Sequence, residues 1–423
     1  MIAAYRIFTN FIYPFLFFFL LFRLILGKED MKRFKEKIFV SHFNIKKKAN
    51  TKLILFHAAS IGEFKSIIPI IEKINSNQKN IEFLITTTTL SSSKIAEKML
   101  KGYDNIHHRF LPFDVKHLVE NFLRLWDPHR IFLVDSEIWP NLILCAKKYK
   151  IPIGIINARI TIKSFRKWLL LKKVAKKIFG IFEFCLCSNK ETRDFLVSLS
   201  AKNVEFKGNI KLIEKVDPHE IKNVNEKMLS NLRFWVAASI HENEDLSCLR
   251  THLNLKKKFS QITTILIPRH IERAKKIEKL SKSFGFETQI LKEGEKIIRN
   301  KEVIIIKSYG ILQDYYKFAK SVFIGKSFRK DLKLDGGQNP IDAAKLNCKI
   351  YHGPYVSNFK EIYDTLKTYK ISSVVEDYKD LSQNLIEDLE SSKKESYTSN
   401  LMQNLEKNIE IETMKLINKF LAV

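Results

Sequence analysis

The chain has 423 residues, with 73 Lys and Arg against 46 Asp and Glu, which leaves a formal net charge of +27. This length is too great for one compact core and predicts two domains, while 45% hydrophobic and 28% charged residues exclude a largely disordered or multi-spanning protein. Composition alone leaves three explanations of the positive charge open: a nucleic acid partner, an anionic membrane surface, or a coding bias toward Lys.

The first predicted element is an apolar N-terminal helix. Residues 11–22 are apolar apart from Tyr13 and Pro14, a run shorter than the ~20 residues that a helix needs to cross hydrocarbon. Residues 28–48 follow with eight Lys or Arg against three acids. An apolar helix with a basic flank predicts a retained anchor over residues 1–27, which either spans an anionic membrane or lies in its interface. The alternative is the buried first helix of a globular domain.

Past residue 50, short apolar or β-branched runs alternate with helical patterns, which predicts parallel βαβ units. The fold class is therefore α/β, with Rossmann-like domains over 28–212 and 232–376, a linker over 213–231 and C-terminal helices over 377–423. The predicted strands are residues 52–56, 81–86, 131–134, 153–157, 184–187 and 204–207, then 234–238, 262–267, 287–291, 303–307, 321–324 and 349–352.

The five cysteines, at positions 145, 185, 187, 248 and 348, show neither CxxC spacing nor an accompanying His cluster. They predict reduced, mostly buried thiols rather than a disulfide framework or a zinc site. No metal site is predicted.

Loops that follow predicted strands carry the candidate site residues, because ligands of open α/β sheets bind at the carboxyl ends of strands. In the first half these loops are HAASIGE at 57–63, DSEIWPN at 135–141 and GNIK at 208–211. The second loop crowds two acids, a Trp and a Pro into one turn, which is more than a helix cap requires. In the first, Ser60 and Glu63 have the spacing of a capping box, so a purely structural role for Glu63 stays open.

In the second half the corresponding loops are AASIHE at 237–242, PRH at 268–270 and GGQNPID at 336–342. The guanidinium of Arg269 is planar, permanently charged and suited to a phosphate. The chain has only 13 Gly, so the adjacent pair before residue 338 is informative. It predicts either a close approach of the backbone to an anion or a tight turn.

Together these motifs resemble the Kdo transferases (3-deoxy-D-manno-octulosonic acid transferases, glycosyltransferase family 30), in order along the chain to about Phe359. They are HAASIGE at 57–63, SEIWPN at 136–141, NAR at 157–159, GNIK at 208–211, AASIHENE at 237–244, PRHIER at 268–273 and GGQNPIDAA at 336–344.

The resemblance implies a GT-B fold and a membrane-anchored, inverting, metal-independent enzyme without a cofactor. Its donor would be CMP-Kdo and its acceptor a lipid A precursor (lipid IVA), in lipopolysaccharide biosynthesis at the cytoplasmic face of the bacterial inner membrane. A GT-B transferase with another nucleotide-sugar and a lipid acceptor is the alternative. A nucleic acid partner is not expected, because no RRM, KH, zinc-finger or helix-turn-helix signature is present.

Carried over residue by residue, the resemblance implies that Glu63 is the general base and that Glu137 and Lys211 assist the transition state. The implied CMP contacts are Pro268, Arg269, Gly310, Ile311, Leu312, Asn339, Pro340, Ile341 and Asp342. Four positions depart from the family pattern and bear on donor affinity: Ile311 for Glu, Lys326 for Gly, Gln338 for His and Asp342 for Glu.

A basic stretch at 163–177 also contains Phe165, Trp168 and several Leu. It predicts either a surface helix packed on its own sheet or a lipid-facing helix whose cations meet anionic head groups. The cations lie next to the predicted anchor, in the stretch at 163–177 and beside the predicted anion sites. The expected polyanionic partner is therefore a phosphorylated glycolipid in an anionic membrane, and the nucleotide-sugar is the smaller anion.

Overall fold

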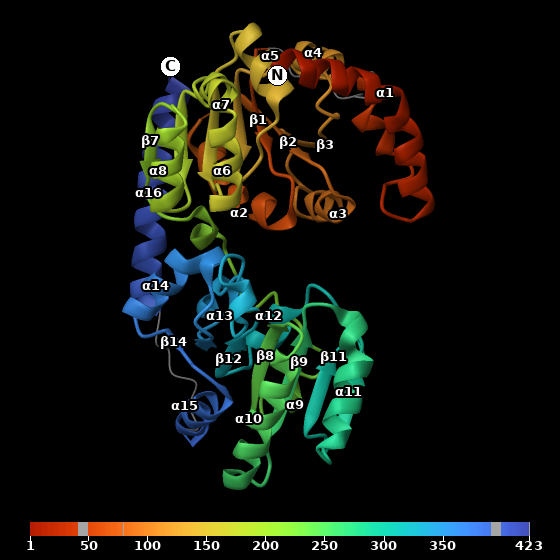
Figure 1. The fold of residues 1–423 in the computed structure, drawn as a ribbon, viewed down its shortest axis with the longest axis vertical. Helices are drawn as coiled ribbons and strands as arrows, with labels where there is room; N and C mark the ends of the chain where they lie inside the picture. The colour runs from red at the N-terminus through yellow and green to blue at the C-terminus, as the bar shows by residue number, and fades with distance from the viewer. Residues whose placement is uncertain (41–49, 79, 391–398, 423) are drawn as a thin grey trace. The chain divides into compact units, whose positions relative to one another are not determined.

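The computed structural model describes residues 1–40, 50–78, 80–390 and 399–422 (Figure 1). Contacts divide the chain into two compact units, each with its own sheet and core. Unit 1 comprises Met1–Glu214 together with the chain from Glu406, and unit 2 comprises Lys215–Leu405.

Unit 1 is built on a seven-stranded sheet in the order β3-β2-β1-β4-β5-β6-β7, and every neighbouring pair is parallel. Most of its strands are buried over their whole length, which explains why they appear in the sequence as continuous apolar runs. The strands are β1 (Lys52–His57), β2 (Ile81–Thr87), β3 (Ile106–Phe110), β4 (Arg130–Val134), β5 (Ile153–Ala158), β6 (Phe184–Cys187) and β7 (Val204–Phe206).

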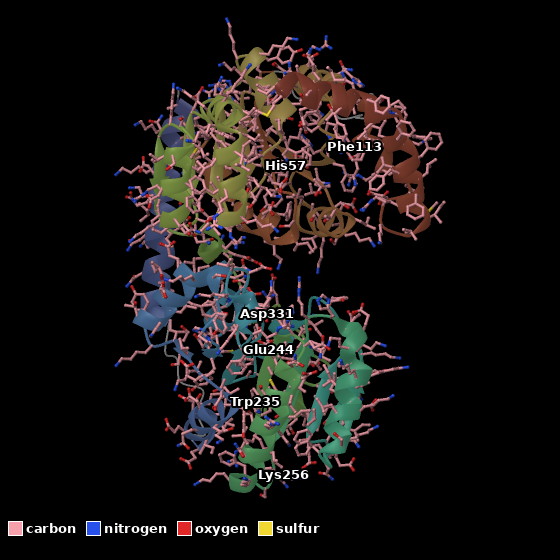
Figure 2. The ribbon with its side chains drawn as sticks, in the orientation of Figure 1. His57, Phe113, Trp235, Glu244, Lys256 and Asp331 are labelled. Carbon is pink, nitrogen blue, oxygen red and sulfur yellow. The ribbon has the colours of Figure 1, made fainter. Side chains whose placement is uncertain are left out.

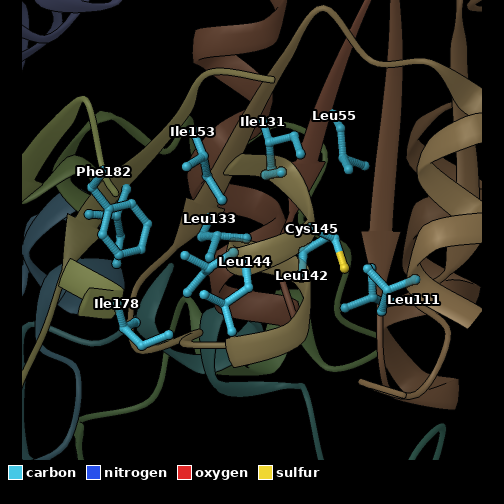
Figure 3. Close-up of a cluster of buried hydrophobic side chains, with 14 of the residues drawn as sticks. Leu55, Leu111, Ile131, Leu133, Leu142, Leu144, Cys145, Ile153, Ile178 and Phe182 are labelled. Atoms are coloured by element: carbon cyan, nitrogen blue, oxygen red, sulfur yellow. The ribbon is translucent and has the colours of Figure 1, made fainter. Parts of the chain in front are cut away.

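Helices cover this sheet and close the core of unit 1. Figure 3 shows part of that core, where Ile131 and Leu133 of the sheet meet Leu142 and Cys145 of a covering helix. The helical elements are α1 (Ile2–Ile25), η1 (Phe34–Lys37), α2 (Ile61–Asn77), α3 (Leu90–Met99), α4 (Lys116–Trp126), α5 (Pro140–Lys148), α6 (Ile162–Leu170), α7 (Lys172–Phe179), α8 (Lys190–Ser198) and η3 (Ile210–Ile213).

Unit 2 repeats the architecture with a second parallel seven-stranded sheet, in the order β10-β11-β9-β8-β12-β13-β14. The strands are β8 (Phe234–Ile240), β9 (Thr263–Pro268), β10 (Thr288–Leu291), β11 (Val303–Ile306), β12 (Ser321–Ile324), β13 (Lys349–His352) and β14 (Ser372–Val374). The helices are α9 (Glu226–Leu229), α10 (Glu244–Lys258), α11 (Ala274–Ser283), α12 (Leu312–Tyr316), α13 (Ile341–Lys345), α14 (Lys360–Thr368) and α15 (Tyr378–Glu390).

The last helix, α16 (Ser399–Ala422), ends in the core of unit 1. The ring of Phe420 lies 5.2 Å from that of Phe132 and 4.8 Å from that of Phe184. The Arg130 guanidinium donates a hydrogen bond to the carbonyl of Phe420. The C-terminal segment therefore contributes to both units rather than forming a separate helical layer.

All twelve predicted strands are present to within two residues at either end, which confirms the α/β class with two Rossmann-like domains. Two strands were not predicted, β3 and β14, and both lie at a sheet edge. The β3 sequence IHHRF has three polar residues in five, and β14 is only three residues long. An edge strand has one neighbour and needs a less apolar sequence than a central strand, so neither segment stands out as a buried run.

In each sheet the chain reverses its direction of winding beside the first strand of the unit. In unit 1 this topological switch point lies between β1 and β4, and in unit 2 between β8 and β12. Ligands of doubly wound sheets bind outside the carboxyl ends of the strands at such a point.

The basic stretch at 163–177 forms two helices, because α6 ends at Leu170 and α7 begins at Lys172. Its aromatic side chains face the core of unit 1. Phe165 stacks on Phe195 at 4.1 Å between ring centroids, and Trp168 meets Phe179 edge-on at 5.1 Å. These are surface helices packed on their own sheet, so most of the apolar residues that suggested a lipid-facing helix are not available to lipid.

All five cysteines are buried and free, as predicted.

Candidate active site

Glu63 lies in the first turn of α2, directly after the carboxyl end of β1 at the switch point of unit 1. Its carboxylate accepts hydrogen bonds from the backbone N–H of Ala59 at 2.7 Å and from the Ser60 hydroxyl at 2.8 Å. The Ser60 hydroxyl in turn accepts the N–H of Glu63, which completes a capping box. The structural role predicted for Glu63 is therefore confirmed, and it fixes the position of the carboxylate.

The environment of Glu63 raises the pKa of its carboxyl above the ordinary value of 4.5. Burial is the largest cause, and the negative charges of Asp135 and Glu137 add to it, while the hydrogen bonds from Ser60 and Ala59 oppose it. A carboxyl in this state binds a proton more readily than an ordinary surface Glu, so it suits a general base.

Glu137 follows β4, the neighbour of β1 across the switch point. The indole N–H of Trp139 donates to its Oε2 at 2.7 Å, and His57 Nε2 lies 3.4 Å from the same oxygen. His57 is fully buried at the end of β1 (labelled in Figure 2), and its Nδ1 contacts the hydroxyl of Thr86 at 3.0 Å. Its Nε2 makes no hydrogen bond within the described residues, so Glu137 is the group that it faces.

Lys211 comes from η3 and pairs with Asp135 at the end of β4, with 2.7 Å between Nζ and Oδ2. Asp135 has a left-handed backbone with φ of 61°. Its second oxygen accepts the hydroxyl of Ser136 at 3.0 Å. The ammonium group of Lys211 is thereby held in place by a carboxylate rather than being free to rotate.

Two further motifs of the sequence hold Lys211 from the backbone side. Asn157, at φ of 56° in β5, accepts the N–H of Ile210 at 3.1 Å. Asn209 caps η3 by accepting the N–H of Lys211 at 3.0 Å. The NAR and GNIK motifs are therefore one physical unit.

The WPN part of the SEIWPN motif starts α5. Pro140 occupies the first turn, where its missing N–H is not needed. Buried Asp114 accepts the N–H of Asn141 at 2.9 Å and that of Leu142 at 2.9 Å, while the Asn141 side chain donates to the Asp114 carbonyl. Trp139 thus fixes Glu137, and Asn141 and Leu142 anchor the turn to the core.

The structure therefore brings the three predicted catalytic residues to one edge of unit 1. It adds Asp135 and His57, to which the motif analysis gave no role. The Asp135–Lys211 pair was missed because the two residues are 76 positions apart and only the tertiary fold joins them. Chemically, the edge offers a carboxyl of raised pKa beside a fixed cation, which suits removal of a hydroxyl proton and stabilisation of negative charge.

A cavity of about 210 Å³ opens beside Asp135 and extends under α6. Its lining includes the apolar residues Ile138, Ile160 and Trp168. Within the described residues, no group of three or more His, Cys, Asp or Glu side chains is arranged to hold a metal ion.

In unit 2 the predicted nucleotide contacts lie at the carboxyl edge of the second sheet. Pro268 is the last residue of β9, and the exposed Arg269 follows it with its N–H bonded to the Ile240 carbonyl at 3.0 Å. The rings of His241 and His270 meet edge-on with 5.7 Å between their centroids. Burial is the largest cause that lowers the pKa of His241, and the nearby charges of Lys326 and Arg269 lower it further, while Glu244 raises it. The result is a positively charged edge, where His241 and Lys326 had no predicted role.

Glu244 organises this edge from inside. It is 1% exposed (labelled in Figure 2), and its carboxylate accepts four backbone N–H groups. The donors are His241 at 2.8 Å, Lys326 at 2.7 Å, Ser327 at 2.8 Å and Phe328 at 3.1 Å. Glu244 therefore ties the loop after β8 to the loop after β12, across the switch point.

Gly325 is required where that carboxylate enters the loop after β12. A Cβ on Gly325 would lie 2.7 Å from Glu244 Oε2 and 2.6 Å from the Ile240 Cα. Lys326, the next residue, has φ of 59°, which glycine adopts at lower cost than lysine. The left-handed backbone explains why glycine suits position 326. In this chain Lys326 adds a cation there, and its Nζ contacts Asp335 at 3.0 Å.

The Gly336–Gly337 pair makes a tight turn against the chain itself. A Cβ on Gly336 would meet the Tyr355 carbonyl at 2.2 Å, and Gly337 has φ of 89°. Of the two readings of this pair, the structure shows the close approach to be to the chain's own backbone. The turn delivers Asn339, which accepts the N–H of Ile341 at 3.1 Å, and places Asp342 in the first turn of α13.

The remaining predicted contacts, Gly310 to Leu312, precede or begin α12, and Gly310 has φ of 79°. They follow β11, which is the neighbour of β9 on the side away from β8. All the predicted nucleotide contacts therefore belong to loops at one edge of unit 2, and their role in binding CMP stays a prediction.

Comparison with known proteins agrees with the motifs. A family model described as 3-deoxy-D-manno-octulosonic-acid transferase (kdotransferase) matches residues 32–213. The chain is 27% identical over 473 residues to the 3-deoxy-D-manno-octulosonic acid transferase of Rickettsia prowazekii (strain Madrid E), covering 100% of both chains. It is 27% identical over 383 residues to a probable mitochondrial 3-deoxy-D-manno-octulosonic acid transferase of Arabidopsis thaliana, covering 88% of this chain and 84% of that one.

Among solved structures, the UDP-GlcNAc 2-epimerase from Neisseria meningitidis bound to UDP-GlcNAc aligns with a TM-score of 0.58 at 13% identity. The alignment covers 87% of this chain and 100% of that one. At this identity the likeness shows the fold alone, which is the predicted GT-B arrangement of two Rossmann-like domains. The family model over residues 32–213 and the full-length relatives go further, and with the ordered motifs they confirm the predicted resemblance to the 3-deoxy-D-manno-octulosonic acid transferases, which are glycosyltransferases.

Proposed function

We propose that the chain transfers Kdo from CMP-Kdo to a lipid A precursor such as lipid IVA, in lipopolysaccharide biosynthesis at the cytoplasmic face of a bacterial inner membrane. The reaction inverts the anomeric configuration and needs neither metal nor cofactor. Similarity to named Kdo transferases supports the transfer of Kdo. The observation that carries the chemistry is the Glu63 carboxyl, held by a capping box beside Asp135 and Glu137 with a raised pKa.

In this proposal the Glu63 carboxylate accepts the proton of an acceptor hydroxyl. The hydroxyl oxygen forms a bond to the anomeric carbon of Kdo from the face opposite the nucleotide. The bond from that carbon to the phosphate oxygen breaks, and CMP leaves with the electron pair. Because Glu63 is anchored by Ala59 and Ser60, the carboxylate keeps one orientation through this step.

Lys211 and Glu137 support the transfer from neighbouring positions. The Lys211 ammonium, fixed by Asp135, stabilises negative charge on the donor carboxylate or the departing phosphate. Glu137, fixed by Trp139 and facing His57, keeps the local charge negative and so favours binding of a proton at Glu63.

The donor binds at the carboxyl edge of unit 2. Arg269 and Lys326 supply charge for the anionic nucleotide, while Asn339 and Asp342 present polar groups for the ribose and phosphate. Asp342 and Ile311 replace acids of other length or charge in the family pattern, so we expect weaker donor binding than in relatives that keep both.

The test is a transfer assay with the purified full chain in several detergents. Incubation with CMP-Kdo and lipid IVA is expected to give Kdo-bearing lipid by mass spectrometry together with free CMP, and the mass reports how many Kdo units are added. UDP-GlcNAc and other UDP-sugars with the same lipid are the matched controls and are expected to give no product. Transfer from a UDP-sugar but not from CMP-Kdo would overturn the proposal.

A further inference from the structure

The two faces of α1 differ in chemistry and in what they contact. One face is exposed and apolar, and five of its phenylalanines are 59–72% exposed. They recur at helical spacing and are Phe8, Phe11, Phe15, Phe18 and Phe22. Within the described residues, α1 is the one helix whose length and composition suit a membrane crossing.

The opposite face of α1 is built into unit 1. Leu20 is fully buried in a cluster with Phe34 and Ile38, and the ring of Tyr13 meets that of His117 edge-on at 4.6 Å. The helix bends as it follows this surface (Figure 1), and Pro14 within it accounts for the bend because its nitrogen cannot donate to the preceding turn.

Polar contacts fix the beginning of α1 to the same unit. The Tyr5 hydroxyl donates to Asp114 Oδ2 at 2.8 Å, and Arg6 Nε donates to Asn141 Oδ1 at 3.2 Å. Asp114 and Asn141 are both buried, and Asn141 lies in the first turn of α5, whose N–H groups bond to Asp114. The first turns of α1 are therefore bonded to the segment that carries Glu137.

A second set of polar contacts fixes the end of α1. The buried carboxylate of Glu29 pairs with Arg23 at 2.7 Å and also with Lys37. Lys37 Nζ donates in addition to the Thr88 carbonyl at 3.0 Å. Both ends of the helix are thus held by ion pairs and hydrogen bonds to unit 1.

Helix length does not decide between crossing a bilayer and lying on it. The 24 residues of α1 extend about 36 Å at ~1.5 Å each, enough for a hydrocarbon core of ~30 Å. The contacts do decide, because a crossing helix would leave unit 1. Arg6 and Tyr5 would then lose their partners, and buried Asp114 would lose the Tyr5 hydrogen bond.

We propose that α1 lies in the plane of the membrane as a monotopic helix, docked on unit 1 by its polar face, with its phenylalanine face in one leaflet. The partner is a phospholipid bilayer, so this inference rests on the membrane location in the proposed function. Exposed Lys28, Lys32 and Lys35 follow the helix and face anionic head groups. Arg33 and Lys37, also in the predicted basic flank, pair within the protein, and Lys46 to Lys48 lie outside the described residues.

This arrangement places the candidate acceptor site next to lipid. Arg6 of α1 bonds to Asn141, and only three residues separate Asn141 from Glu137 along the chain. The leaflet that holds the phenylalanine face therefore lies beside the unit that carries the proposed base. A lipid acceptor could reach this unit without leaving the membrane.

Topology labelling tests the proposal without relying on activity. One variant carries Lys28→Cys, and another carries a single thiol on a short Gly–Ser extension ahead of Met1. Because the five native cysteines are buried, the parent chain is the low-background control. In sealed inside-out inner-membrane vesicles, a membrane-impermeant maleimide is expected to label both thiols to the same extent. Labelling of the extension only after detergent, with the thiol at position 28 labelled before it, would show a crossing helix and overturn the proposal.

A flotation experiment tests the lipid-facing surface with the purified full chain. Phe11→Asp combined with Phe15→Asp is expected to lower binding to vesicles of phosphatidylethanolamine and phosphatidylglycerol by tenfold or more. Val197→Asp, at an apolar position of α8 that is 58% exposed, is the matched control and is expected to leave binding unchanged. Equal binding of the double variant and the control would contradict the proposal, whether or not the chain transfers Kdo.

Discussion

The two sheet edges of this protein have the same topology and opposite charge. At the switch point of unit 1, three acids gather, and their mutual repulsion adds to burial in raising the pKa of Glu63. At the switch point of unit 2, the acid Glu244 is buried, and four backbone N–H groups satisfy its charge. The cations Arg269 and Lys326 then dominate that edge.

The difference shows how one architecture supports two tasks. Burial and the charges of two neighbouring acids make Glu63 bind a proton more readily, which suits a base. An acid whose oxygens accept four backbone N–H groups is held rigidly, and it shapes a loop for an anion. The proposed division of labour, with proton transfer in unit 1 and nucleotide binding in unit 2, follows from this contrast.

The largest loss of activity is expected from removing the proposed base in unit 1. Glu63→Gln keeps the size of the side chain and the Ser60 cap but cannot accept a proton, so turnover should fall by about 10²–10⁴-fold. The measurement is CMP release with CMP-Kdo and lipid IVA at saturation. Glu97→Gln, at an exposed acid of α3, is the control for loss of a carboxylate, and a fully active Glu63→Gln would remove Glu63 from the role of base.

The pH profile of the unchanged protein tests the same residue in another way. A base must be ionised, so activity is lost as the pH falls through its pKa. Because the pKa of Glu63 is raised, the acid limb of kcat/KM should have its midpoint above 4.5. An acid limb at or below that value would mean that a different, unperturbed group controls the rate.

A smaller effect is expected when the cation of unit 1 is released. Lys211→Met should lower turnover by about 10²-fold, the scale of one lost charge-stabilising donor. Asp135→Asn should lower it less, since Lys211 remains but is no longer held at 2.7 Å. The double variant should be no worse than Lys211→Met alone, and strictly additive losses in kcat would show that Asp135 does not act by positioning Lys211.

In unit 2 we expect a substitution at Glu244 to disorder the nucleotide-binding loops rather than to remove a group that takes part in the reaction. Glu244→Gln replaces a buried carboxylate that accepts four N–H groups, at a cost of about 1.5–3 kcal/mol for hydrogen bonds to a charged group. Amide exchange at Ser327 and Phe328 should accelerate, and CMP affinity should fall. Glu242→Gln, at a half-exposed acid two residues away, should change neither, and equal behaviour of the two variants would refute the organising role of Glu244.

The smallest effect is expected at the residue where this chain departs from glycine. Lys326→Gly relieves a left-handed backbone at φ of 59° but removes a cation from the nucleotide edge. CMP affinity should fall only about two- to fivefold, the size of a partly exposed charge interaction. Lys326→Arg should keep the affinity, and tighter binding of CMP by Lys326→Gly would show that the cation hinders the donor.

Most strands of this fold could be predicted from the sequence because central parallel strands are buried on both faces and are therefore continuously apolar. The seven-residue runs of β2 and β8 are buried throughout, and continuous apolar runs of this length are typical of such strands. Two of the four edge strands, β3 and β14, were missed because an edge strand needs no such run. The site residues that follow strands could be found by their motifs, whereas their partners could not.

The partners depend on contacts that no local pattern contains. Asp135 meets Lys211 across 76 residues, and Glu244 meets Ser327 across 83. The apolar N-terminal run predicted a membrane helix but not its docking, because Tyr5 and Arg6 find Asp114 and Asn141 only in the folded unit. Polar residues on one face of an apolar helix were the available signal.

The most direct test of the division of labour measures CMP affinity and turnover in the same preparations of two variants. Glu63→Gln is predicted to bind CMP as the unchanged protein does and to lose turnover. Arg269→Met is predicted to bind CMP more weakly and to retain turnover when CMP-Kdo is saturating. If Glu63→Gln lost CMP affinity while keeping its turnover, or Arg269→Met lost turnover without losing affinity, the two edges would not have the separate roles assigned to them.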